Sequence, residues 1–160
     1  MGTTENDLLL ERQLCFGLSV ASRSVIAAYK PVLSALQLTH PQYLVMLALW
    51  EQAPRKVKEI GSALLLESAT LSPLLKRLEA LGYITRARDA SDERALAIDL
   101  TPTGAALREQ ALSVPGTMMA KLGLDREGAM ALHSTMMALI EAATRTEESA
   151  DAKTLAVADN

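Results

Sequence analysis

The chain has 160 residues, a length that fits one domain with a hydrophobic core. Hydrophobic residues make up 49% of it and aromatic residues only 3%, so Leu, Ala, Val and Met must build the core, which favours helices. The single cysteine excludes an intrachain disulfide and a multi-cysteine metal site. His40 and His133 lie far apart in the sequence and form no ligand cluster, so we expect no metal and no other cofactor.

No apolar run is long enough to span a membrane, and the N-terminal segment MGTTENDLLLERQ is too polar for a secretory signal. We therefore expect a cytoplasmic protein with no membrane partner. The formal net charge of −3 is unevenly distributed. Residues 55–94 carry eight Lys/Arg and six Asp/Glu, residues 1–54 carry three and four, and residues 95–160 carry five and nine. The positive charge thus lies in one block, and local charge governs contact with phosphates more than the total does.

A long first helix is predicted from about residue 6 to residue 36, because six small or apolar residues keep a three-to-four spacing. These are Leu14, Leu18, Ala21, Val25, Ala28 and Val32. A helix of this length usually packs against a partner, since one small domain cannot cover it. Thr39 to Gln42 then form a capping box, with Pro in the first turn, that opens a second helix ending near Gln52.

Residues 57–100 are the most informative part of the chain. VKEIGSALLLE carries an apolar helical stripe at Val57, Ile60, Leu64 and Leu65. A second helix follows, starting near Ala69 or Thr70 because Pro73 must lie in its first turn. Its apolar side contains five leucines: Leu71, Leu74, Leu75, Leu78 and Leu81. Gly82 is placed to end it as a left-handed cap.

YITRAR and ALAIDL then alternate like two strands around the polar tip DASDER. The order helix, turn, helix, hairpin predicts a mainly α fold with a small β-wing, a winged helix-turn-helix over residues 41–100. The main use of that fold is the recognition of double-stranded DNA.

Thr101 and Pro102 start a further helix, which Pro115 and Gly116 break or kink. A last helix is predicted from about residue 125 to residue 143, and the acidic residues 145–160 are predicted to form a flexible tail. We expect one domain over residues 1–160, with residues 6–36 and 102–143 as dimerisation helices. The alternative for their apolar faces is ordinary core packing, but winged domains often bind palindromic DNA as homodimers.

The candidate DNA-binding residues lie on the second helix of the motif and on the hairpin: Ser68, Thr70, Ser72, Lys76, Arg77, Arg86, Asp92 and Arg94. Small hydroxyls at the start of that helix can contact bases or phosphates. Lys76 and Arg77 either contact phosphates or belong to an ordinary solvated face. Arg94, oriented by Asp92 through a bidentate pair, can enter a narrow minor groove from the hairpin tip.

Cys15 is the candidate reactive residue. A lone cysteine on an apolar helix face is usually core filler, but Tyr29 lies two heptads away on the same face. At 1.5 Å per residue the two are about 21 Å apart and cannot touch within one chain. Two such helices packed antiparallel about Ser22 would place Cys15 beside the partner's Tyr29. A phenol there can hydrogen-bond a thiolate and lower the pKa of the thiol.

Several of these segments resemble the MarR family of dimeric winged-helix regulators, over roughly residues 8 to 143. DER at Asp92–Arg94 marks the wider family. LCF around Cys15, YKP from Tyr29 and PQYLV after His40 mark its organic hydroperoxide resistance branch. The resemblance implies a transcriptional repressor, not an enzyme, whose Cys15 thiolate is oxidised by an organic hydroperoxide, after which a palindromic operator is released.

The resemblance also implies that Tyr29, His40 and Tyr43 surround the thiol. The branch typically has a tyrosine where this chain has His40, and often an aromatic residue near Ser19. His40 either replaces one hydrogen bond or is a plain residue of the first helical turn. Members with a second cysteine carry it near Thr117. Without it, oxidised Cys15 must pair with a low-molecular-weight thiol, cyclise onto a backbone nitrogen or become over-oxidised.

Two other functions compete with the thiol switch. The first is a regulator of the same fold that binds an aromatic or phenolic ligand in the dimer crevice, with Cys15 as filler. The second is a peroxidase using Cys15, which would need an activating cation and a recycling route. Only Arg12 and Arg23 lie near Cys15 in the sequence, and the chain has no resolving cysteine, so the peroxidase is disfavoured.

Overall fold

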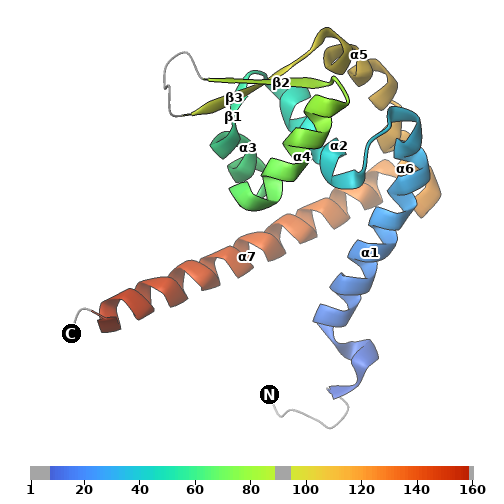
Figure 1. Cartoon of the computed structure of the whole chain (residues 1–160). Helices are drawn as coiled ribbons and strands as arrows, with labels where there is room; N and C mark the ends of the chain where they lie inside the picture. Colours follow the sequence, from blue (N-terminus) through green and yellow to red (C-terminus); the bar gives the residue numbers. More distant parts are fainter. Residues whose placement is uncertain (1–7, 89–94, 159–160) are drawn as a thin grey trace. The chain divides into compact units, whose positions relative to one another are not determined.

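The computed structural model describes residues 8–88 and 95–158, with side chains as far as residue 145 (Figure 1). The chain divides into two compact units, Met1–Met118 and Met119–Asn160. The first unit contains the winged helix-turn-helix expected from the sequence, and the second consists of the end of one helix and a long final helix. The predicted fold class is confirmed: the chain is mainly helical with one small antiparallel sheet.

The first helix is shorter than predicted. A 3-10 turn, η2 (Leu10–Arg12), precedes α1 (Leu14–Leu33), and a second, η3 (Ser34–Leu36), follows it. The regular helix begins at Leu14 because Gln13 is extended, with φ −77° and ψ 123°. The 3-10 turn η3 that continues α1 ends at Leu36, because Gln37 takes a left-handed conformation, with φ 55°. Residues 6 and 7, the predicted start, lie outside the described residues.

Helix α2 (His40–Glu51) starts as predicted. The backbone N–H of Thr39 donates to Oε1 of Gln42 at 2.9 Å, which is one half of the capping box. Gln42 is buried with only 5% of its surface exposed, so this bond also satisfies a polar group inside the core.

Helices α3 (Val57–Leu64) and α4 (Ser68–Ala80) form the helix-turn-helix. Leu65 does not join the apolar stripe of α3: it caps the helix at φ 53°, and its side chain is 70% exposed. Helix α4 begins at Ser68, so Pro73 is its sixth residue and not part of the first turn. The missing N–H of Pro73 leaves the carbonyl of Ala69 without its helical donor, which an exposed residue tolerates because water can replace it.

The wing is a three-stranded antiparallel sheet in the order β1-β3-β2. Strands β2 (Ile84–Arg88) and β3 (Leu96–Leu100) pair with Arg86 opposite Ile98. Strand β1 (Arg55–Lys56), which the sequence did not predict, pairs with the far edge of β3. Gly82 ends α4 as predicted, at φ 76°. The N–H groups of Gly82 and Tyr83 close the Schellman pattern on Glu79 and Leu78.

Helix α5 (Pro102–Ala111) starts at the predicted cap, where the Thr101 hydroxyl accepts from the N–H of Gly104 at 3.0 Å. Helix α6 (Val114–Leu122) follows a break at residues 112–113, just before Pro115. Helix α7 (Arg126–Ala158) continues past the predicted end at residue 143, through the segment predicted as a flexible tail. That helix lies in the second unit.

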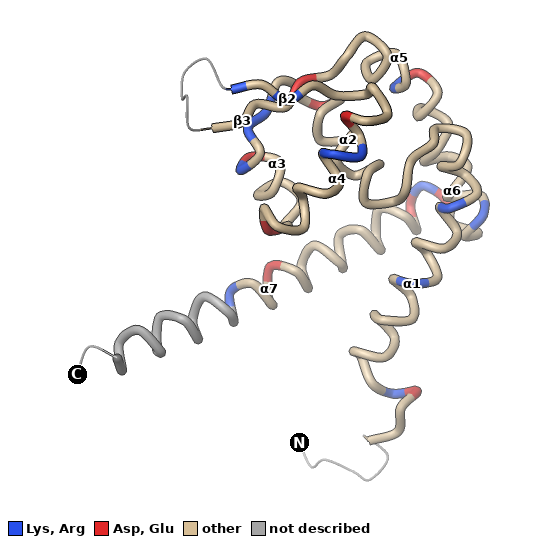
Figure 2. Tube along the Cα trace, viewed as in Figure 1, with Lys and Arg blue, Asp and Glu red and all other residues tan. Residues whose placement is uncertain are grey.

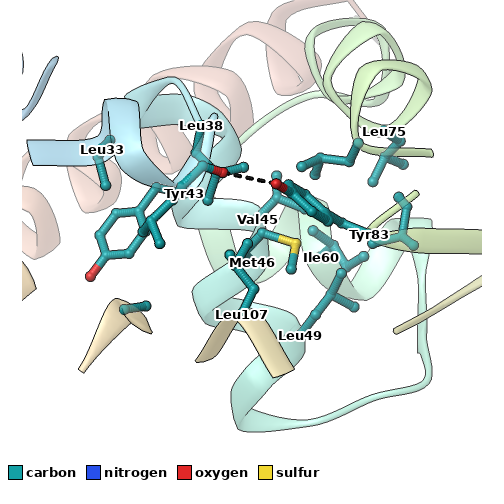
Figure 3. Close-up of a cluster of buried hydrophobic side chains, with 14 of the residues drawn as sticks. Leu33, Leu38, Tyr43, Val45, Met46, Leu49, Ile60, Leu75, Tyr83 and Leu107 are labelled. Carbon is teal, nitrogen blue, oxygen red and sulfur yellow. Dashed lines mark hydrogen bonds between the residues drawn. The ribbon is translucent and has the colours of Figure 1, made fainter. Parts of the chain in front are cut away.

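The core of the first unit is built around α2 and α4, with the start of β2, the middle of β3 and α5 closing it (Figure 3). Its fully buried side chains are Leu33, Val45, Met46, Leu49, Ile60, Leu71, Leu78, Ile84 and Ile98. Leu33 is the one buried residue of α1, and the other side chains of that helix are partly or fully exposed in the single chain. No single helix of the described residues is long and apolar enough to cross a membrane. Two consecutive helical segments, Leu14–Leu36 and His40–Glu51, are together long and apolar enough by length and composition alone, but the chain bends by 65° between them.

Candidate nucleic-acid interface and thiol environment

Helix α4 presents a polar face opposite its buried leucines. Ser68, Thr70 and Ser72 are all exposed along its N-terminal half. Lys76 and Arg77 follow on the same exposed side and form one positive stretch of the helix (Figure 2). This arrangement follows from helical periodicity, because the buried positions 71, 75 and 78 leave the intervening residues outside. The helix can therefore offer hydroxyls and two cations to a nucleic acid at the same time.

The basic residues of α4 and β2 differ in their ion pairing. Within the described residues, no ion pair joins Lys76, Arg77 or Arg88 to an acidic side chain. Arg86 differs, because its Nε donates to Oε2 of Glu79 at 2.8 Å. The hydrogen bond from Arg86 holds the pKa of the Glu79 carboxyl below its ordinary value. The structure thus assigns Arg86 a partner that the sequence analysis did not foresee.

Asp92 and Arg94 lie outside the described residues, so their placement at the hairpin tip stays a prediction. The two strands that lead to the tip are described: β2 ends at Arg88 and β3 begins at Leu96.

The base of the wing is held by hydrogen bonds that join distant parts of the chain. The buried Tyr83 hydroxyl donates to the carbonyl of Leu36 at 3.0 Å, which ties the start of β2 to the turn after α1 (Figure 3). Trp50 Nε1 donates to the carbonyl of Gly104 at 2.9 Å. The Thr101 hydroxyl donates to the carbonyl of Gly82 at 2.6 Å. Sequence reasoning missed these bonds, because their partners lie far apart along the chain.

Tyr29, His40 and Tyr43, the residues predicted to surround the thiol, come together at the junction of α1 and α2. The Tyr29 ring lies edge-on to His40, with centroids 5.1 Å apart, and 6.1 Å from the ring of Tyr43. Trp50 extends this aromatic cluster, 6.3 Å from Tyr43. Burial lowers the pKa of His40, so its imidazole is neutral at pH 7. Burial, and then the charge of Tyr29 when that phenol ionises, raise the pKa of Tyr43.

Cys15 is exposed near the start of α1, away from the aromatic cluster. Fourteen residues of helix separate it from Tyr29, about 21 Å along the axis. The chain by itself therefore does not bring the thiol to its predicted neighbours. No group of three or more possible metal ligands occurs within the described part of the chain.

A cavity of about 570 Å³ opens beside the cluster, between the end of α1, the start of α2 and α4. Ile26, Leu38 and Leu81 provide apolar lining, and Lys30 and Arg77 bring cations from two different helices. His40 belongs to both the cavity lining and the aromatic cluster. The cavity thus joins the polar face of α4 to the surroundings of Tyr29.

Comparison with known proteins identifies the class of this fold. The family model described as transcriptional regulator SarA/Rot matches residues 27–110. The chain is 33% identical to reduced AbfR bound to DNA, with a TM-score of 0.72 over 87% of this chain and 98% of that one. AbfR, from Staphylococcus epidermidis, is also known in an overoxidized form bound to DNA and in a disulfide form. The fold and its exposed basic helix therefore define a winged-helix, DNA-binding regulator of transcription.

Two relatives narrow the assignment. The chain is 46% identical to the organic hydroperoxide resistance transcriptional regulator of Bacillus subtilis, over 82% of this chain and 90% of that protein. It is 37% identical to the regulator SarZ of Staphylococcus saprophyticus over the same shares. The chain belongs to the MarR family, among the organic hydroperoxide resistance regulators, as the sequence motifs predicted. These relatives are regulators and not enzymes.

Proposed function

We propose that this regulator is a homodimeric repressor that releases a palindromic operator when an organic hydroperoxide oxidises Cys15. The observation that carries the proposal is the cluster of Tyr29, His40 and Tyr43 on a chain whose one cysteine is exposed on the same helix as Tyr29. The 46% identity to a regulator of organic hydroperoxide resistance supports the choice of oxidant.

Dimerisation supplies the geometry that one chain lacks. Helix α1 has 20 residues and buries only Leu33, so most of its length is open to a second copy. If two α1 helices cross antiparallel near Ser22, each Cys15 meets the aromatic cluster of the other chain. Phenol hydroxyls there stabilise the thiolate by donating hydrogen bonds to it. The neutral His40 can add one hydrogen bond but no positive charge at pH 7.

The chemistry is a two-electron oxidation of sulfur. The Cys15 thiolate attacks the distal oxygen of the hydroperoxide, an S–O bond forms and the O–O bond breaks. The alkoxide leaves and takes up a proton, equivalent to the one that the thiol lost on ionisation, to give the alcohol, while the sulfur keeps the distal OH and becomes a sulfenic acid. A low-molecular-weight thiol then attacks this sulfur, which forms a mixed disulfide and releases water.

We expect the mixed disulfide to be the form that leaves DNA, because it adds a bulky group to an interface between helices. Displacement of α1 would alter the spacing of the two α4 helices, which must match one turn of DNA. AbfR is described as bound to DNA when overoxidized, which fits a release step that depends on bulk more than on added oxygen.

The test is DNA binding with and without oxidant. Fluorescence anisotropy on a duplex from the chain's own upstream region should show release by cumene hydroperoxide plus a small thiol, and recovery with dithiothreitol. Cys15→Ser should bind equally well and ignore the oxidant. If Cys15→Ser still loses DNA, oxidation acts elsewhere, for instance at the seven methionines, and the proposal fails.

A second candidate function is supported by the cavity beside His40. A cavity of about 570 Å³ with apolar lining and two cations suits a small aromatic carboxylate. Such a ligand would engage Arg77, which also lies on the exposed face of α4. This role does not need Cys15, and the cavity lies within one chain, whereas the sequence placed the ligand in the dimer crevice.

The two functions are separable with one probe. Benzoate or 4-hydroxybenzoate at millimolar concentration should release DNA from both wild type and Cys15→Ser if the cavity is the sensor. Lys30→Gln should then abolish the response. If neither compound affects DNA binding, the cavity is not a sensor of small aromatic carboxylates.

A further inference from the structure

We propose that Glu79 is a positioning residue for DNA recognition. It holds Arg86 against the end of α4, so that the helix and the wing present their cations to DNA with fixed geometry. This inference concerns the DNA-binding step and does not depend on how the signal is sensed.

The contact joins two elements that are separated by a turn. Glu79 lies one residue before the end of α4, and Arg86 is the third residue of β2. Both Nε and Nη2 of Arg86 contact the same oxygen, Oε2 of Glu79, with Nε at 2.8 Å. Two donors on one acceptor fix the plane of the guanidinium relative to the helix.

The position of Arg86 in the sheet explains why it faces the helix. Ile84 is buried, and side chains two residues apart in a strand share a face, so Arg86 lies on the side of β2 that packs inward. Its side chain is 28% exposed and that of Glu79 37%. The pair is therefore partly shielded from water, unlike the exposed Lys76 and Arg77. The hydrogen bond from Arg86 also lowers the pKa of Glu79, as expected for a carboxylate that accepts from a guanidinium.

The alternative is that Arg86 contacts a DNA phosphate and Glu79 is incidental. The two readings predict opposite signs for the same substitution. If Glu79 is incidental, Glu79→Gln removes a negative charge beside the DNA and binding should tighten. If Glu79 positions the wing, Glu79→Gln removes the ion pair that fixes Arg86 of β2 against α4, and binding should weaken although the charge repulsion between this position and DNA has decreased.

The chain offers a matched control. Glu67 is exposed, lies directly before α4 and its side chain makes no capping bond there. Glu67→Gln removes the same charge next to the same helix, from a side chain for which no contact between elements is seen. It should bind DNA as tightly as wild type or more tightly.

The experiment is anisotropy on the upstream duplex at several salt concentrations, with a hydroxyl-radical footprint of each complex. We expect Glu79→Gln and Arg86→Gln each to bind about fivefold more weakly, and the double variant no more weakly than either single one. In the footprint, protection from the hairpin should be lost, while protection from α4 in the major groove remains. A general loss of folding would weaken both regions together.

The exchanged pair Glu79→Arg/Arg86→Glu guards against the case in which the single variants fold poorly. It should recover most of the affinity and the hairpin footprint, because the ion pair is restored with reversed direction. The inference is overturned if Glu79→Gln binds as tightly as wild type, or if the hairpin footprint of Glu79→Gln is unchanged. It is also overturned if the exchanged pair binds more weakly than both single variants.

Discussion

Gly104 is the position at which one added methyl group should do most harm. An alanine Cβ there would lie 1.9 Å from the carbonyl oxygen of Tyr83 and 2.8 Å from its carbonyl carbon. These are backbone atoms at the start of the wing, so no side-chain rotation can relieve the clash. Gly104→Ala must therefore push the start of α5 away from β2.

The size of the effect follows from the distances. Ordinary contact begins at 3.4 Å, so α5 and the Tyr83 backbone must separate by about 1.5 Å. Three hydrogen bonds of 2.9–3.1 Å cross or border this gap: Trp50 to Gly104, Thr101 to Tyr83, and Gly104 to Thr101. Loss of two at about 1 kcal/mol each, plus overpacking of about 2 kcal/mol, minus about 1 kcal/mol of gained helix propensity, gives a destabilisation of about 3 kcal/mol.

Denaturation by guanidinium chloride, at one fixed protein concentration, measures this change. Trp50 is the only tryptophan, and its indole donates to Gly104, so its fluorescence reports on the same contact. The control is Gly116→Ala in α6, where an added Cβ meets nothing within 4 Å of this chain and stability should hold or rise. Wild-type stability and unchanged Trp50 emission in Gly104→Ala would refute the packing argument.

Four further outcomes are expected. Lys76→Gln and Arg77→Gln should each lower the slope of log K against log salt by about 0.9 if the side chain contacts a phosphate, and an unchanged slope would remove it from the interface. Arg94→Ala should weaken binding by about 1–3 kcal/mol, and equal affinity would refute its role in a groove. Tyr83→Phe leaves a buried carbonyl in η3 without its donor and should cost about 1–2 kcal/mol of unfolding free energy, whereas wild-type stability would show the bond to be dispensable. Burial lowers the pKa of His40 in the folded chain, so as the pH falls the unfolded chain binds the proton at a higher pH than the folded chain does. The free energy of unfolding should therefore be constant above about pH 6.5 and decrease below it. His40→Gln should reduce that decrease when unfolding is measured over a series of pH values.

Local signals in the sequence predicted the ends of elements well. The capping box at Thr39, the left-handed glycine at Gly82 and the cap at Thr101 are all present. Each depends on residues within four positions of one another, which is the range over which sequence determines backbone geometry. The buried leucines of α4 were predictable for the same reason, because helical periodicity is also local.

Contacts between distant residues were not predictable in this way. Strand β1 has two residues, too few for a period, and exists because it pairs with β3. Leu65 fits the apolar spacing but takes the left-handed cap, because the turn between α3 and α4 requires it there. Arg86 resembles the other basic residues in the sequence, and only the packing of β2 against α4 shows that Glu79 holds it.

The thiol site shows how a sequence can specify a site that one chain does not complete. The spacing of Cys15 and Tyr29 put them on one helix face, and family motifs added His40 and Tyr43. The fold joins the three aromatic residues, because α2 turns back at Thr39 against the end of α1. It leaves Cys15 about four turns of helix away. A reactive thiol needs donors beside it, so a second copy must bring them if Cys15 is the sensor. Dimerisation and thiol reactivity are thus one hypothesis, and a monomer at the concentration that binds DNA would remove both.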